Sequence, residues 1–149
     1  MNAITRETSK AIIKDHDNGF FSILVDESRD ILVKEQMTLI LRYVNKEGII
    51  IERFLGIVHV ASTIILSLKY AIECLLCERN LSLSKLRGQG YDGASNMQGN
   101  INGLKTLILK ENKLALYVHC FSHQLRLTLV AVVKNHINIA EFFFMWLVI

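Results

Sequence analysis

The sequence predicts one α/β domain built on a single mixed five-stranded sheet. Its 149 residues correspond to one domain. Hydrophobic residues make up 51% and proline is absent, so the chain can bury a core and run strands and helices without interruption. The hydrophobic period also changes along the chain, from three strand-like segments to an alternation of helix and strand. The resulting order, β-β-β-α-β-α-β-α, favours a mixed sheet flanked by helices on both faces.

The first half of the chain predicts three antiparallel strands joined by short turns. Phe20–Val25 is an apolar run that ends in a polar cluster, which is typical of a strand buried on both faces. Met37–Val44 is rich in β-forming residues and ends at the turn sequence Asn-Lys-Glu-Gly. Ile49–Val60 is the third strand, and Gly56 marks the place where we expect a bulge.

The second half predicts three helices that alternate with two strands. Apolar residues recur at helical spacing from Ser62 or Thr63, either of which is a good N-cap, to about Asn80. The other elements are the strand Leu86–Tyr91, the helix Asn100–Glu111, the strand Leu114–Val118 and a helix from His119 onward. The simplest topology has the strand order 3-2-1-4-5, which puts the first and fourth strands side by side.

Two carboxylates follow these neighbouring strands, Asp26 after the first and Asp92 after the fourth. Ligands of open sheets bind beyond the carboxyl ends of the strands, and Mg²⁺ or Mn²⁺ prefers carboxylate oxygens. The pair is therefore a candidate divalent-metal site for phosphodiester chemistry. Acidic residues after strands also serve as turn caps or as solvated surface, and the spacing alone leaves both interpretations open.

Three longer stretches carry a family resemblance. GQGYDGASNMQGNINGLK (Gly88–Lys105) and YVHCFSHQLRLTLV (Tyr117–Val130) resemble the catalytic domain of hAT (hobo/Activator-type) DNA transposases, and FFSILVDESRD (Phe20–Asp30) resembles the first catalytic strand. The resemblance is nearest to transposase-derived MYM-type zinc-finger-like proteins and covers about residues 15–135. The family has a ribonuclease H-like fold, which agrees with the topology that the periodicity predicts.

The resemblance implies a role for six residues. Asp26 and Asp92 match the first two acids of an Asp-Asp-Glu metal site, Gly93 and Asn96 lie in the second motif, and Cys120 and His123 match a Cys-x-x-His signature. It also implies Mg²⁺ or Mn²⁺ as cofactor, DNA as partner, strand cleavage and transfer as the reaction, and the nucleus as the location. Asn96 either orients Asp92 or caps the following helix, and we expect the cap.

The chain departs from the family pattern in its third acid. In the family that acid comes from a late helix beyond a long insertion, whereas Glu141 is the last carboxylate here and no motif links it to the site. We therefore expect residues 1–149 to form a single partial ribonuclease H-like domain, truncated before the insertion and inactive alone. The alternative function is a non-catalytic module that binds nucleic acid or protein.

The cysteines allow a second metal hypothesis. Cys74-x-x-Cys77 and Cys120-x-x-His123 have the spacing of a zinc site. However, Cys74 and Cys77 sit in a leucine-rich helix, where free cysteine behaves as a small buried hydrophobe, and nothing in the pattern requires the two pairs to meet. We expect no bound zinc.

Other polar and small residues near the motifs have structural interpretations. His16 and His119 are expected to be core-edge or surface residues, and Gly88, Gly90 and Gly93 are expected to let the backbone turn tightly around Asp92. Residues 76–149 hold 8 basic against 4 acidic residues, which permits an anionic partner and is equally typical of a solvated surface.

The two ends of the chain bear on location and assembly. No secretory signal precedes the domain, so we expect a reducing intracellular compartment. The longest uninterrupted apolar run, Phe142–Ile149, has eight residues and is too short for a membrane helix. Because one small domain cannot bury so many large apolar side chains, we expect this tail to mediate self-association or to contact a missing C-terminal domain.

Overall fold

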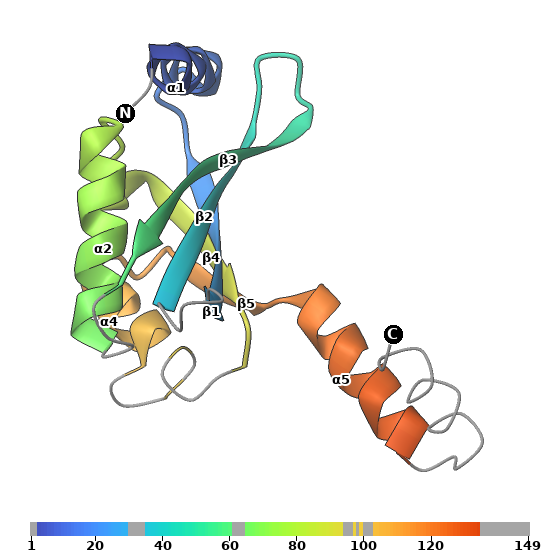
Figure 1. The fold of residues 1–149 in the computed structure, drawn as a ribbon. Helices are drawn as coiled ribbons and strands as arrows, with labels where there is room; N and C mark the ends of the chain where they lie inside the picture. The colour runs from blue at the N-terminus through green and yellow to red at the C-terminus, as the bar shows by residue number, and fades with distance from the viewer. Residues whose placement is uncertain are drawn as a thin grey trace.

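The protein contains one five-stranded sheet with the order β3-β2-β1-β4-β5, as the sequence predicts. The computed structural model describes residues 3–29, 35–60, 65–93, 97, 99 and 103–134. The strands are β1 (Phe21–Arg29), β2 (Glu35–Val44), β3 (Ile50–His59), β4 (Leu86–Tyr91) and β5 (Leu116–His119). The helices are α1 (Ala3–His16), α2 (Ile65–Glu78), α4 (Leu104–Glu111) and α5 (Phe121–Lys134), with a short 3₁₀ turn, η1 (Leu83–Lys85), before β4. Figure 1 shows α2 and α4 against one face of the sheet and α5 projecting away on the other side.

The first three strands form the antiparallel meander that the sequence predicts. β1 pairs with β2 from Phe21↔Tyr43 to Arg29↔Glu35, and β2 pairs with β3 through a turn at residues 45–48. Gly48 has a φ of 78°, a left-handed conformation that glycine adopts without steric cost. The register shifts between Leu39 and Ile40, so that the extra residue of β3 is Leu55, next to the expected bulge at Gly56.

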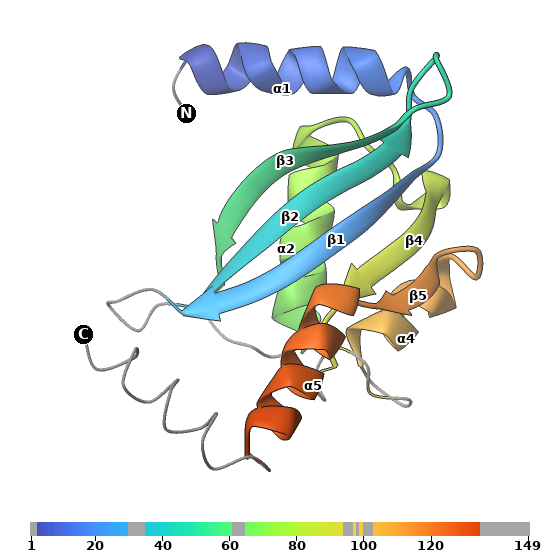
Figure 2. The ribbon, with the colours of Figure 1, turned by 90° about the vertical axis from the view of Figure 1, so that its right-hand side faces the viewer.

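The parallel half of the sheet follows from the two crossovers. β1 pairs with β4, and β4 with β5, both in parallel (Figure 2). On β2 the alternate residues Met37, Leu39 and Leu41 are each 0% exposed, and they face the buried side of α2. A strand that buries every second residue in this way has its register fixed, because a slip of one residue would turn the whole apolar set outward.

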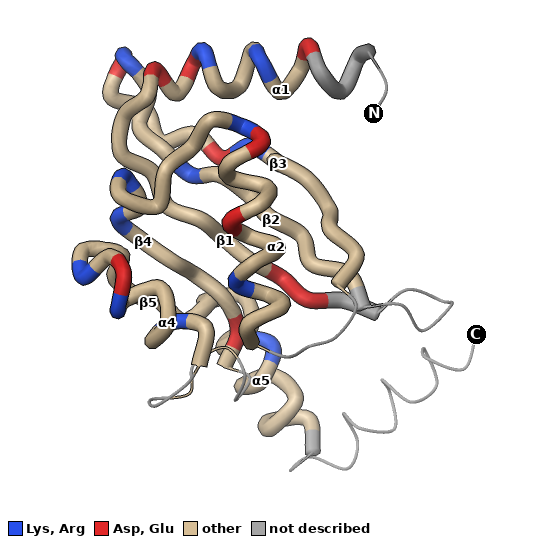
Figure 3. The backbone as a smooth tube through the Cα atoms, turned by 90° about the vertical axis from the view of Figure 1, so that its left-hand side faces the viewer, with Lys and Arg blue, Asp and Glu red and all other residues tan. Residues whose placement is uncertain are grey.

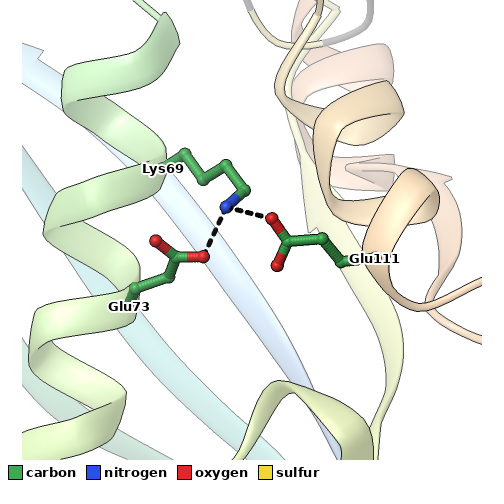
Figure 4. A network of polar contacts seen from close by, with 3 residues as sticks. All are labelled: Lys69, Glu73 and Glu111. Carbon is green, nitrogen blue, oxygen red and sulfur yellow. Dashed lines mark hydrogen bonds and ion pairs between the residues drawn. The ribbon is translucent and has the colours of Figure 1, made fainter.

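A partly buried ion-pair cluster joins the two helices that cover this face. Lys69 of α2 contacts Glu73 on its own helix and Glu111 at the end of α4 (Figure 4). The Lys69 side chain is only 14% exposed. Burial lowers its pKa, but the hydrogen bonds to Glu111 and Glu73 outweigh that effect, so the pKa lies above its ordinary value. The charged lysine therefore ties α4 to α2.

Helix α1 is the element that the sequence analysis did not predict. It crosses one end of the sheet (Figure 2), and Ile12 and Ile13 pack against the core. His16, 2% exposed, packs edge-on against Phe21 and Tyr43, and the Tyr43 hydroxyl donates a hydrogen bond to Asp15. Burial and that carboxylate together raise the pKa of Tyr43 to about 12. His16 is thus a core residue, as expected for a structural histidine.

Two details of the predicted strands are corrected. β1 does not end at Val25 but continues to Arg29, so that Asp26 lies inside the strand opposite Thr38. Residues 26–29, the polar cluster after the apolar run, remain extended because β2 continues to pair with them beyond the last β1–β4 pair. Gly88 and Gly90 do not form a turn either, since both lie in β4. A Cβ atom on Gly88 would lie 2.5 Å from the Ser22 hydroxyl oxygen, so this glycine allows close cross-strand packing.

Several expectations fall outside the residues that the structure describes. These are the helix caps at Ser62 and Thr63, the start of the helix at residues 100–102, Asn96, Glu141 and the tail Phe142–Ile149.

Candidate functional site

The β1–β4 ladder brings the two candidate carboxylates to one end of the sheet. The last parallel pair joins Leu24 to Gly90, and Asp26 and Asp92 each follow two residues later. Residues two apart on a strand share a face, so Asp26 lies on the face of Leu24, opposite the buried side chains of Ile23 and Val25. Asp26 is exposed and Asp92 is half-buried. Figure 3 shows acidic residues at the carboxyl ends of both strands.

Asp92 is anchored by the strand that follows it in the sheet. The Tyr117 hydroxyl of β5 donates to the backbone oxygen of Asp92 at 3.1 Å and lies 3.4 Å from that of Tyr91. The Tyr91 and Tyr117 rings are 5.2 Å apart. Burial raises the pKa of Tyr117, and the nearby Asp92 and Cys120 raise it further. Tyr117 therefore stays neutral and can donate this bond throughout the physiological pH range.

The Cys-x-x-His motif lies beside the same strand end. The Cys120 amide donates to the Tyr91 backbone oxygen at 2.9 Å, and the Cys120 backbone oxygen accepts from the Gln124 amide at 3.0 Å. Cys120 thus links the end of β4 to the first turn of α5. The rings of His119 and His123 are 5.8 Å apart, with an interplanar angle of 32°. Asp92 and Cys120, which are 28 residues apart in the sequence, therefore lie at the same end of the sheet.

A buried polar network beneath Asp92 was not predicted from the sequence. Gln89 is 1% exposed, and its amide donates to the backbone oxygens of Ala115 at 2.7 Å and Lys105 at 3.2 Å. The buried Tyr91 hydroxyl donates to the Gln89 side-chain oxygen. Burial and the neighbouring Tyr117 raise the pKa of Tyr91. The sequence signal for this network was a glutamine between two glycines of an apolar strand. A polar side chain at such a position is buried only when it is hydrogen-bonded, so the glutamine indicates a buried network.

The glycine-rich motif also fixes the start of α4. Gly103 is the N-cap of α4, and its amide donates to the Gly99 backbone oxygen at 3.0 Å. The Thr106 hydroxyl donates to the same oxygen at 2.9 Å. A Cβ atom on Gly103 would lie 2.3 Å from the Gly99 nitrogen, so only glycine fits here. The motif that contains Asp92 thus packs its own backbone tightly against the next helix.

The donor set of this end partly fits a divalent ion. Asp26 and Asp92 supply hard oxygen ligands of the kind that Mg²⁺ and Mn²⁺ prefer. Across the described ranges, no three His, Cys, Asp or Glu side chains gather closely enough to hold a metal. This holds for Cys74, Cys77, Cys120 and His123 as well. Cys74 is half-buried and Cys77 is exposed, so the expectation that both are buried hydrophobes is wrong. Both cysteines lie on α2 outside its fully buried leucine face.

The sheet order and the motifs define the class of protein. A mixed sheet with the order β3-β2-β1-β4-β5, flanked by helices, is the ribonuclease H-like arrangement. Residues 1–103 match the ZMYM1/FAM200, RNase-like domain family (DUF4371), and the chain belongs to this family. The fold and the family together identify a transposase-derived RNase-like domain.

Two curated relatives match most of the chain. A human protein named "52 kDa repressor of the inhibitor of the protein kinase" is 27% identical over 130 residues, which is 86% of this chain and 16% of that protein. The mouse protein of the same name is 27% identical over 123 residues, 81% of this chain and 16% of that protein. The chain therefore spans about one sixth of the length of these relatives. No helix in the described part of the chain is long and apolar enough to cross a membrane.

Proposed function

We propose that the chain is a domain of hAT transposase descent in which Asp26 and Asp92 bind a divalent ion, and that it does not cleave DNA by itself. The observation that carries the proposal is the register of β1 and β4, because both carboxylates follow the pair Leu24↔Gly90 by two residues. Carboxylates from two adjacent strands at one end of a sheet can hold the divalent ions that phosphodiester chemistry uses.

The residues of the proposed site would have two kinds of role, binding the ion and positioning the backbone. Asp26 and Asp92 would hold Mg²⁺ or Mn²⁺, which as a Lewis acid stabilises the charge that develops on a phosphodiester in the parent reaction. Tyr117 and Cys120 act on the backbone around Asp92 and keep that carboxylate at the strand end. Gly93 follows Asp92 directly and adds no side chain beside that carboxylate. His123 is a positioning residue at the start of α5.

Two ligands are fewer than strand cleavage needs. In the described part of the chain no third carboxylate, histidine or cysteine joins the pair. Two carboxylates alone hold Mg²⁺ weakly, because the ion keeps most of its waters. We therefore infer millimolar affinity and no turnover of DNA by this chain.

A second candidate function is a non-catalytic module that binds nucleic acid or protein. The printed name of the human and mouse relatives is that of a repressor rather than of an enzyme, which favours a binding role. The excess of 8 basic over 4 acidic residues in positions 76–149 supports DNA as the partner. The nucleus is the location that such a role requires.

Nicking of supercoiled plasmid in Mn²⁺ tests the first function. We expect the wild-type chain and Asp92→Ala to give the same background of nicked circles. Nicking that is lost in Asp92→Ala and kept in Glu47→Ala, a matched change in an exposed turn, would contradict the absence of catalysis.

Binding tests the second function on the same preparations. Gel shift of a duplex without metal is expected to weaken steeply as salt rises, because phosphate contacts release counterions. Failure to shift any duplex at low salt would remove DNA as the partner and leave a protein-binding module.

A further inference from the structure

A hollow of about 980 Å³ lies at the far edge of the sheet from the two carboxylates. It is enclosed by α1, β3 and α2. Phe54–Val60, seven consecutive residues, all line it. A hollow over one face of a strand would touch alternate residues, because successive side chains point to opposite faces. Lining by consecutive residues means that the hollow follows the backbone edge of β3.

That edge is suited to pairing with another strand. β3 is the terminal strand of the sheet and has β2 as its neighbour. Natural edge strands are usually protected by charged side chains or proline. Phe54–Val60 (FLGIVHV) contains no Lys, Arg, Asp, Glu or Pro. In the described part of the chain no strand pairs with this side of β3, so its backbone groups face the hollow, and an added strand has to accommodate the bulge at Leu55.

The walls of the hollow are apolar. Ile12 comes from α1, and Tyr70, Ala71, Cys74 and Leu75 come from α2. Tyr70 is 69% exposed, whereas Ala71 and Leu75 belong to the core. Alternate side chains of an added strand would meet this wall, so the occupant needs apolar residues at every second position.

One end of the hollow is cationic. A second hollow, of about 860 Å³, adjoins the first and shares Ser9, Glu78 and Arg79 with it. Lys10 and Lys14 of α1 also line this second hollow. Lys10, Lys14 and Arg79 face Glu78 here, and Lys10 also pairs with Glu7, so three cations stand against two carboxylates and the excess positive charge is one. Acidic groups are complementary to this end.

We propose that this groove binds an extended peptide that adds a strand to the free edge of β3, with apolar residues in alternation and acidic residues at one end. Main-chain hydrogen bonds to β3 provide the affinity, the α2 wall selects the apolar positions, and Lys10 and Lys14 select the acidic end. Seven residues at about 3.3 Å each require a peptide segment roughly 23 Å long. The groove is separate from Asp26 and Asp92, and the proposal does not depend on the proposed function.

Fluorescence anisotropy with labelled peptides tests the proposal on the full 149-residue chain. The probes are a seven-residue valine–threonine repeat followed by two aspartates, and the same repeat preceded by them. We expect one of the two to bind, and its lysine-ended counterpart to bind about fivefold more weakly, as expected for two exposed ion pairs. Absence of binding by both aspartate peptides would overturn the proposal.

N-methylation of the peptide identifies strand addition. An added strand uses the amides of one edge only, so methylating one set of alternate amides is expected to weaken binding by about tenfold or more, while the other set has little effect. Equal effects of the two sets would overturn strand addition.

Charge reversal locates the site on the protein. Lys10→Glu with Lys14→Glu is expected to remove the preference for aspartate, and Lys110→Glu with Lys113→Glu, a matched change on exposed residues outside both hollows, is expected to retain it. If both pairs behave alike, the assignment is wrong. Sedimentation of the protein without peptide tests whether a second copy of the chain occupies the groove. A dimer that dissociates when peptide is added would show a second copy on this edge and would overturn the assignment to a separate peptide.

Discussion

The substitution Gly103→Ala tests whether the second motif is held by backbone packing. Gly103 has a φ of −65°, a value that alanine adopts freely, so the cost of the added methyl group is steric rather than conformational. That methyl would lie 2.3 Å, 2.5 Å and 2.7 Å from the nitrogen, oxygen and Cα of Gly99. None of these atoms can rotate away, because all three belong to the backbone that also accepts the hydrogen bonds from Gly103 and Thr106.

Overpacking of a rigid site lowers the free energy of unfolding by about 1–3 kcal/mol. The three backbone clashes place Gly103→Ala at the upper end of this range, about 3 kcal/mol. With a urea m-value of about 2 kcal/mol per molar, the unfolding midpoint should fall by about 1.5 M. Gly90→Ala is the matched control, since its methyl meets the mobile end of Leu24 at 2.8 Å and should cost less than about 1 kcal/mol. A Gly103→Ala midpoint equal to that of Gly90→Ala would refute the reasoning.

Three further perturbations test the helix contacts and the carboxylates. Lys69→Met should lower the free energy of unfolding by about 1 kcal/mol, discounted because Glu111 is 50% exposed, and Glu111→Gln by less than that; equal urea midpoints for wild type and Lys69→Met would contradict the role of the cluster. Burial lowers the pKa of His16 below 6.5, so the unfolded chain binds the proton more readily. Stability should therefore fall as the pH drops below 6.5, by up to about 1.4 kcal/mol per pH unit, and His16→Leu should remove this part of the slope; an unchanged slope would show that His16 is not the group responsible. At about twice its dissociation constant, Mg²⁺ or Mn²⁺ should stabilise the fold by about 0.6 kcal/mol, which is about 2 °C in Tm. Asp26→Asn should abolish this gain, and a gain that persists in Asp26→Asn would place the ion elsewhere.

The sheet could be predicted from the sequence because its strands are patterned by burial. Met37, Leu39 and Leu41 alternate with polar or half-exposed residues and fix both the presence and the register of β2. β4 was also predicted correctly from Leu86 to Tyr91, as a short strand that stops before Asp92-Gly93, although its burial does not alternate. Strand ends were less predictable, because Asp26 remains paired with Thr38 although its side chain points to solvent. Pairing with a neighbour, rather than side-chain polarity, decides where β1 ends.

Helix α1 was not predicted, although Ile12 and Ile13 in its second half pack against the core. Its last residue, His16, is buried against Phe21 and Tyr43. A histidine and an aspartate at the end of a polar segment give no periodic signal, and their partners lie on two different strands. The role of Gly88 was hidden for the same reason, since it depends on the position of Ser22 in the neighbouring strand.

The hydrogen bonds of the two long motifs have a structural role that does not require catalysis. Tyr117 binds the backbone of Asp92, Cys120 binds the backbone of Tyr91, and Gln89 joins β4 to α4 and to the residue before β5. Each of these bonds uses a main-chain acceptor, so each orients the strand end without using the carboxylate of Asp92. They hold the end of β4 to β5, to α4 and to the start of α5 whether or not the domain acts on DNA, and the bond from Cys120 is made by its backbone amide and needs no thiol. These contacts therefore account for the packing at this end of the sheet, whereas the metal site that we propose rests on Asp26 and Asp92.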